Sequence, residues 1–198
     1  MRFGIAGLAT VAALGVVSAN CGGHSGRQGK REIFVVLSEN MSPRLNINQR
    51  IEFDMDAYKT QAPRVGDIVL IHPPRGAALG RCGSPRQPVA GQLCVKPFGG
   101  PDPESLRFIM RVVAVGGDRI SLRRGRVVRN GTLERRRGLS ACTIDEGCTF
   151  PRTITVPAGH VYLLGDNRPS SDDSRFWGAL PTAQLVGRYV RTVSAGTR

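Results

Sequence analysis

Lysine is scarce in this chain, and so are aromatic side chains. Only Lys30, Lys59 and Lys96 are lysines among 28 basic residues, and the formal net charge is +13. Aromatic residues make up 6% of the sequence, which also holds 25 glycines and 13 prolines. Helix interiors do not tolerate so much glycine and proline. The composition therefore argues against a helical bundle and predicts mainly β structure with many turns.

The basic charge does not by itself identify a partner. A basic surface can bind nucleic acid, anionic lipid or acidic proteins. Arginines concentrate in residues 119–137, but no aromatic side chains alternate with them to stack nucleic-acid bases. We therefore expect no nucleic acid, and interpret this stretch as a solvated or lipid-facing rim. A basic module for lipid or nucleic acid stays an alternative.

The usual sequence patterns of a metal site are also missing. The chain has five cysteines, at Cys21, Cys82, Cys94, Cys142 and Cys148. They form no CxxC pair, and no histidine lies among them at zinc-finger spacing. We expect no metal and no cofactor. If the domain lies outside the cytoplasm, the simplest connectivity is two local disulfides, Cys82 with Cys94 and Cys142 with Cys148.

The chain divides by composition into three parts. Residues 1–20 are an apolar run after one arginine, which predicts a membrane anchor or signal segment. A cleaved signal peptide, an uncleaved anchor and, least favoured, a lipoprotein signal ending at Cys21 remain open. Residues 21–30 are rich in glycine and polar groups, as in a flexible linker. Residues 31–198 are predicted to form one β domain with an insertion at 72–107, on the extracytoplasmic side, or secreted if the first segment is cleaved.

Short apolar runs rich in β-branched residues predict the strands of this domain. Turns at Gly125 and at Asn130-Gly131 predict that residues 108–131 form a β meander. A Pro-Ala-Gly turn divides residues 153–164 into two strands. The other predicted strands lie within residues 31–37, 49–55, 65–71 and 185–190.

The densest group of polar side chains is GDNRPSSDDSRFWG, at residues 165–178. With the Leu-Pro and Val-Gly-Arg that follow it, this loop resembles the signature of type I signal peptidases. Three further segments resemble the family in the same order: Gly-Asp-Ile-Val at 66–69, Arg-Val-Val at 111–113 and Val-Pro-Ala-Gly-His at 156–160. The resemblance implies a mainly β fold of coiled antiparallel sheets.

The resemblance also implies an activity. Type I signal peptidases are membrane-anchored serine endopeptidases that remove signal peptides, with a serine nucleophile and a lysine base. A lysine can accept a proton near neutral pH when an apolar site lowers its pKa. The implied partners are therefore signal-peptide-bearing preproteins and the membrane.

Both residues that carry this chemistry are substituted here. The family's Ser-x-Ser-Met-x-Pro corresponds to SENMSP at residues 38–43, so Asn40 occupies the nucleophile position. The family's Lys-Arg-Val corresponds to residues 110–112, so Met110 occupies the base position. A carboxamide is not activated as a hydroxyl is, and a thioether accepts no proton at physiological pH. The sequence therefore predicts a catalytically impaired protein, or a pseudoprotease that binds signal-peptide-like segments.

The surrounding family positions are kept. Ser38 matches the oxyanion-hole serine, and Ser171 matches the serine that orients the base. We expect buried ion pairing near the site and interpret Asp166 and Asn167 as loop formers. The residues with such structural roles are Arg111, Asp166, Asn167, Asp173, Ser174 and Arg175.

One active alternative remains. If residues 38–42 are extended, side chains two positions apart lie on one face, which would place Ser42 beside Ser38 and Asn40. Ser42 is then a displaced nucleophile in an active signal peptidase.

Overall fold

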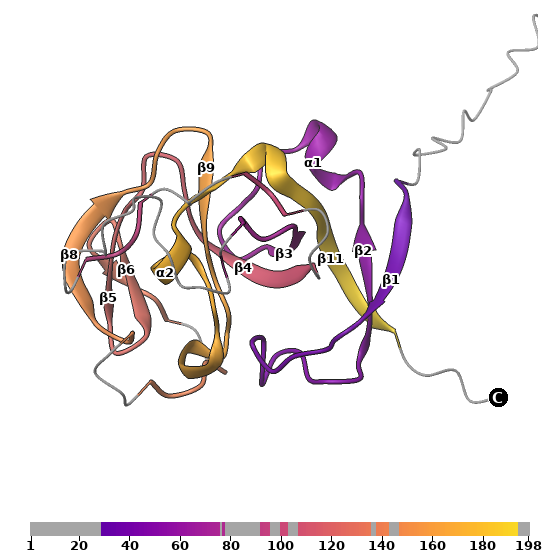
Figure 1. The fold of residues 1–198 in the computed structure, drawn as a ribbon, viewed down its shortest axis with the longest axis horizontal. Helices are drawn as coiled ribbons and strands as arrows, with labels where there is room; N and C mark the ends of the chain where they lie inside the picture. The colour runs from indigo at the N-terminus through magenta and orange to yellow at the C-terminus, as the bar shows by residue number, and fades with distance from the viewer. Residues whose placement is uncertain are drawn as a thin grey trace, which may run out of the picture.

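Two antiparallel β-sheets make up the part of the chain that the structure describes (Figure 1). This computed structural model describes residues 29–75, 77, 92–95, 100–102, 107–135, 138–142 and 147–193. The sheets curl and the helices are short, which confirms the predicted mainly β fold. The strands are β1 (Arg31–Val35), β2 (Arg50–Asp54), β3 (Ile68–Ile71), β4 (Phe108–Val115), β5 (Arg119–Arg123), β6 (Arg126–Arg129), β7 (Thr132–Leu133), β8 (Phe150–Thr155), β9 (His160–Leu164), β10 (Leu180–Pro181) and β11 (Leu185–Val193). The helices are α1 (Ala57–Thr60), α2 (Ser174–Trp177) and the 3-10 turns η2 (Arg168–Ser170) and η3 (Thr182–Gln184).

The larger sheet has seven strands in the order β1-β2-β11-β3-β4-β9-β10. β1 lies at one edge, and the C-terminal strand β11 runs between β2 and β3 (Figure 1). Arg188 of β11 is opposite Asp54 of β2 on one side and Val69 of β3 on the other. The described contacts thus join the first two strands to the rest of the sheet through β11.

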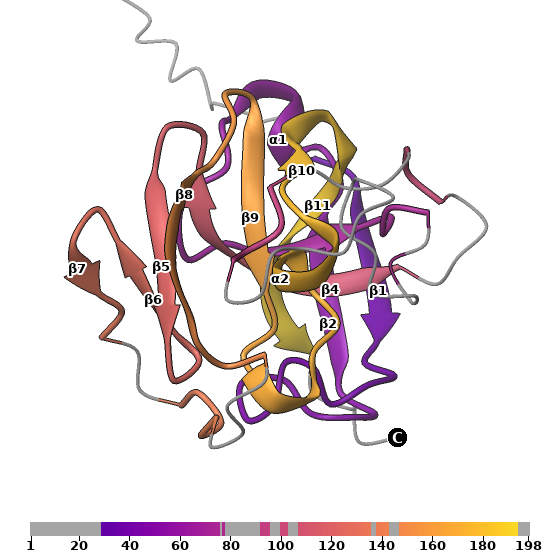
Figure 2. The same cartoon turned by 60° about the vertical axis from the view of Figure 1, so that its left-hand side comes forward.

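The smaller sheet has the order β7-β6-β5-β8 (Figure 2). β5, β6 and β7 form the predicted meander, but the prediction that β4 belongs to it is wrong. β4 is buried along both faces and pairs with β3 and β9 in the larger sheet. The chain turns out of β4 where the Asp118 carboxylate accepts from Val115 N at 2.9 Å and from Asn130 Nδ2 at 2.6 Å.

The larger sheet buries apolar side chains on both of its faces. Along β3, Ile68 and Leu70 join one cluster while Val69 and Ile71 join another. Such continuous apolar runs are typical of strands covered on both sides. β4 divides in the same way, because Ile109 and Met110 belong to opposite clusters. The scaffold around Met110 is therefore a packed core.

Several predictions fall wholly or partly outside the described residues. Residues 1–20, most of the 21–30 linker, Cys82 and much of the 72–107 insertion are among them. The Cys142–Cys148 disulfide is confirmed. Cys94 is buried and disulfide-bonded, but its predicted pairing with Cys82 stays a prediction. No helix in the described part of the chain is long and apolar enough to cross a membrane.

Candidate functional site

The loop of residues 165–178 lies against the turn that follows β1. The Asn167 backbone N–H donates to the carbonyl oxygen of Asn40 at 2.9 Å, and Asn167 Nδ2 donates to the Glu39 carbonyl at 3.1 Å. The loop contains η2 and α2, neither of which the sequence predicted. α2 begins where the Asp173 side chain accepts from Arg175 N, and it ends at Gly178, whose φ is 99°. Local capping therefore shapes a segment too short to show helical periodicity.

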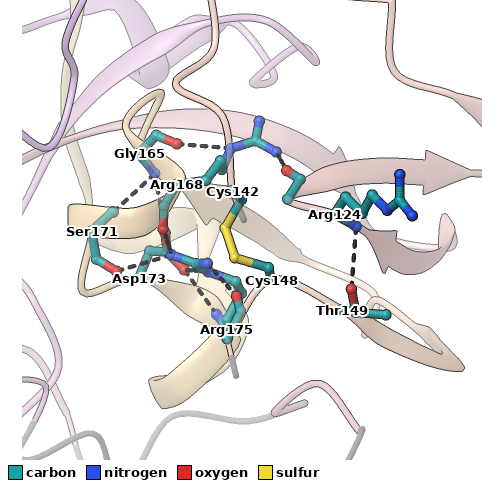
Figure 3. Close-up of a disulfide and its surroundings, with 11 residues drawn as sticks. Arg124, Cys142, Cys148, Thr149, Gly165, Arg168, Ser171, Asp173 and Arg175 are labelled. Carbon is teal, nitrogen blue, oxygen red and sulfur yellow. Dashed lines mark hydrogen bonds and ion pairs between the residues drawn. A yellow bond between two sulfur atoms is a disulfide. The ribbon is translucent and has the colours of Figure 1, made fainter. Parts of the chain in front are cut away.

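Two buried arginines stabilise this loop (Figure 3). Arg175 forms a bidentate ion pair with Asp173, at 2.7 and 3.0 Å, and also donates to the carbonyls of Arg168 and Ser171. Arg168 donates to the carbonyl of Gly165 at 2.9 Å. Guanidinium groups bound to several acceptors at once restrict a loop more than one hydrogen bond does. The position of Ser171 is thereby fixed.

The disulfide lies beside these arginines (Figure 3). Gly147, within the ring that Cys142–Cys148 closes, accepts a hydrogen bond from Arg175 at 2.5 Å. On the other side, a Cβ on Gly125 would be 2.7 Å from the Cβ of Cys142. Gly125 also has a φ of 75° and accepts from Arg168. The small sheet can approach the disulfide this closely because residue 125 has no side chain.

Asn40 and Met110 meet where β4 passes the loop. Asn40 Nδ2 donates to the carbonyl of Ile109 at 2.7 Å and lies 3.8 Å from Met110 Sδ. Asn40 Oδ1 accepts from Ser38 Oγ at 2.7 Å. Both ends of the carboxamide are therefore bound within the protein.

Gly165 brings Ser171 to the same place. Its backbone N–H donates to Ser171 Oγ and to Asp173 Oδ2, each at 3.2 Å. A Cβ built on Gly165 would clash with the carbonyl oxygen of Asn40 and with Ser171 Oγ. The close approach of Asn40 and Ser171 thus requires glycine here.

A cleft of about 610 Å³ opens beside Asn40 and Met110. This volume is within the range of ligand pockets. Its walls are mostly apolar, and the two charged side chains among the described lining residues are Arg107 and Asp172. The other described lining residues are Phe34, Val35, Leu37, Ser38, Asn40, Leu70, Phe108, Ile109, Met110 and Ser170.

Comparison with known proteins identifies the origin of this arrangement. The family model for signal peptidase, peptidase S26, matches residues 11–193. The signal peptidase I of Leptolyngbya laminosa is 31% identical over 185 residues, which cover 93% of this chain and 74% of that protein. The chain belongs to the signal peptidase I family.

Other members of the signal peptidase I family match over part of their length. A probable signal peptidase I-1 of Synechocystis is 30% identical over 77% of this chain and 65% of its own length. Thylakoidal processing peptidase 1 of Arabidopsis thaliana is 30% identical over 78% and 39%. A crystal structure of a signal peptidase I from Enterococcus faecalis aligns with 66% of this chain and 98% of that one, at 22% identity and a TM-score of 0.43. The chain thus spans between 39% and 74% of the lengths of the three relatives compared by sequence.

The alternation of side chains in the sequence predicted a role for Ser42 only if residues 38–42 are extended, and they are not. These residues form successive turns, in which Ser42 N donates to the Glu39 carbonyl and Leu45 N to that of Met41, each at 2.9 Å. The Ser42 hydroxyl donates to Asn46 Oδ1 at 3.2 Å. Ser42 is not among the described residues that line the cleft.

Three side chains of the 165–178 loop have roles that the sequence did not indicate. Asp166, interpreted as a loop former, is the buried bidentate partner of Arg111, at 2.7 and 2.6 Å. Arg168 is buried and paired with Glu134 at 3.0 Å. Asp172 faces the cleft, whereas the adjacent Asp173 pairs with Arg175. The one sequence feature that could have drawn attention to Asp172 is its position next to Asp173, which already had a predicted role.

Replacing Gly165 with alanine tests how this signal peptidase loop is held. The Gly165→Ala variant is expected to lose about 1–3 kcal/mol of unfolding free energy, because overpacking forces backbone apart. Denaturant unfolding measures this loss. The matched control is Gly100→Ala, since a Cβ on Gly100 meets nothing within 4 Å. Equal stability of both variants would contradict the close packing of Asn40 and Ser171 against Gly165.

Proposed function

We propose that this protein binds signal-peptide-like segments of exported preproteins without cleaving them. The observation that carries the proposal is the state of Asn40. Its carboxamide occupies the position matched to the family's nucleophile and is bound by Ser38, by the Ile109 carbonyl and by the Met110 thioether. The Asn40 carboxamide does not supply a nucleophile, and the Met110 thioether does not supply a base.

The cleft supports peptide binding. β1 is an edge strand of the sheet, and Val35 and Leu37 at its end line the cleft with 47% and 67% of their surfaces exposed. An extended peptide can add to a sheet edge and place alternate side chains in adjoining pockets. Apolar walls suit the small and apolar side chains of signal peptides.

We further propose that the protein works at a membrane, with its β domain on the extracytoplasmic side. Ile33 and Val35 of β1 and Leu37 just beyond its end alternate along one face, with 49%, 47% and 67% of their surfaces exposed. The net charge of +13 favours anionic lipid. The Cys142–Cys148 disulfide is consistent with an oxidising compartment. Residues 1–20 would supply the anchor, or a secreted form would follow from their cleavage.

Peptide binding and mass spectrometry together test the proposal. A fluorescent peptide containing a signal-peptide cleavage region is expected to bind the purified protein and to remain intact after prolonged incubation. Leu37→Asp should weaken binding at least about tenfold, since it places a charge in the apolar wall. Leu133→Asp, an exposed leucine on the small sheet, is the matched control and should leave binding unchanged.

Two results would contradict the proposal. Absence of binding by the folded protein would remove the binding function. Specific cleavage of the peptide would show that catalysis survives, and loss of that cleavage in Ser42→Ala would assign it to Ser42.

A further inference from the structure

One acidic side chain interrupts the apolar lining of the cleft. Asp172 is half-buried and lies on the cleft wall with Asn40 and Met110. Within the described residues, its carboxylate makes no hydrogen bond or ion pair, unlike that of Asp173 next to it. A partly desolvated carboxylate without a counterion is unfavourable. The cleft therefore contains an acceptor that its own side chains leave unused.

The arginine that interacts electrostatically with Asp172 and the arginine on the cleft wall are both already engaged. Arg175 is bound to both oxygens of Asp173. Arg107, the other charged residue on the cleft wall, has its guanidinium 5.4 Å from the centre of the Phe34 ring and 3.9 Å from Glu32. Burial and the neighbouring Asp173 carboxylate raise the pKa of Asp172 to about 6, although Arg175 opposes the shift. The group is thus ionised at neutral pH and neutral in mild acid.

We propose that Asp172 makes the cleft selective for peptides that place a lysine or arginine side chain against it. This inference rests on the proposed peptide-binding function. A bound ammonium or guanidinium group would supply the missing counterion through a charge-assisted hydrogen bond. The aliphatic part of the same side chain would pack on the apolar wall that includes Leu70 and Phe108.

The charge of the whole protein makes this selectivity easy to recognise. A net charge of +13 repels cationic peptides at long range and attracts anionic ones. At about 0.15 M salt such long-range effects are screened beyond about 8 Å. A preference for a cationic side chain would therefore arise from local contact within the cleft.

The test is a positional scan with peptides acetylated at the N-terminus and amidated at the C-terminus. Lysine, glutamine or glutamate is moved through an otherwise small and apolar sequence, and the Kd is measured by fluorescence polarisation. At about pH 7.5 one position should favour lysine over glutamine by about tenfold, as for a hydrogen bond to a charged group. At about pH 5 the preference should shrink, because Asp172 is then largely protonated.

Two variants separate a local contact from a general charge effect. Asp172→Asn should abolish the lysine preference, so that lysine and glutamine peptides bind this variant with similar Kd values. Glu52→Gln changes the net charge equally but lies outside the described cleft lining, so it should keep the preference. Equal binding of lysine and glutamine peptides at every position, or a preference that persists in Asp172→Asn, would overturn the inference. If no peptide binds, the proposed function fails with it.

Discussion

The double variant Asn40→Ser, Met110→Lys is expected to cleave a preprotein that the unmodified protein leaves intact. Asn40 Nδ2 and Met110 Sδ are 3.8 Å apart, so serine and lysine at these positions would lie within reach of each other. Met110 is 1% exposed in an apolar cluster, where burial would lower the pKa of a lysine toward neutrality. We expect cleavage at least about 10³-fold above background, measured by mass spectrometry of the product.

The single variants are the controls for this gain. Asn40→Ser alone lacks a base and Met110→Lys alone lacks a nucleophile, so both should stay inert. A double variant that folds and binds peptide but does not cleave would show that Ser38 and Ser171 no longer support catalysis at the oxyanion-hole and base-orienting positions. Cleavage by the unmodified protein at the same rate would place the chemistry elsewhere.

Arg175→Met is expected to cost at least about 3–5 kcal/mol of unfolding free energy, because it leaves the buried Asp173 carboxylate without its partner. The side chains of Arg175 and Asp173 are 2% and 0% exposed. Arg175 also donates to the carbonyls of Gly147, Arg168 and Ser171, which would be left without this donor. Urea unfolding followed by tryptophan fluorescence measures the loss, since Trp177 is buried in the adjoining core.

Arg191→Met is the matched control for Arg175. Arg191 pairs with Glu52 through its Nε at 2.6 Å, a distance similar to the 2.7 Å in the buried pair, but its side chain is 66% exposed. An exposed pair contributes about 0–1 kcal/mol. Similar losses in both variants would contradict the view that burial makes the Arg175 pair indispensable.

Local sequence signals were sufficient for the strands. β-branched runs and glycine turns placed β1, β2, β5 and β6 because each depends on a few adjacent residues. The strand at β4 was predicted as well, but its placement in the meander was wrong. Its neighbours β3 and β9 are distant in sequence, and its local turn chemistry resembles that of the meander it precedes.

The candidate site was predictable in position but not in pairing. The motif resemblance selected Asn40, Met110 and Ser171. The structure places Asn40 Nδ2 3.8 Å from Met110 Sδ and brings Asn40 and Ser171 together at Gly165. The resemblance did not indicate that Asp166 pairs with Arg111, since two acids and two arginines allow more than one pairing. The resemblance also gave no reason for Asp172 to face the cleft, because that orientation depends on where η2 ends. The catalytic and supporting roles of Asn40, Met110 and Ser171 remain predictions.

The central place of β11 in the larger sheet determines when the cleft can exist. During synthesis β1 and β2 emerge first, but their described route into the sheet runs through the last strand. Contacts between such distant segments form slowly, because the intervening chain must be ordered first. In a nascent chain that still lacks β11, the β1–β2 hairpin that carries Asn40 has no strand pairing to the segment that carries Met110. We therefore expect the cleft to form late in folding, after β11 has been translated.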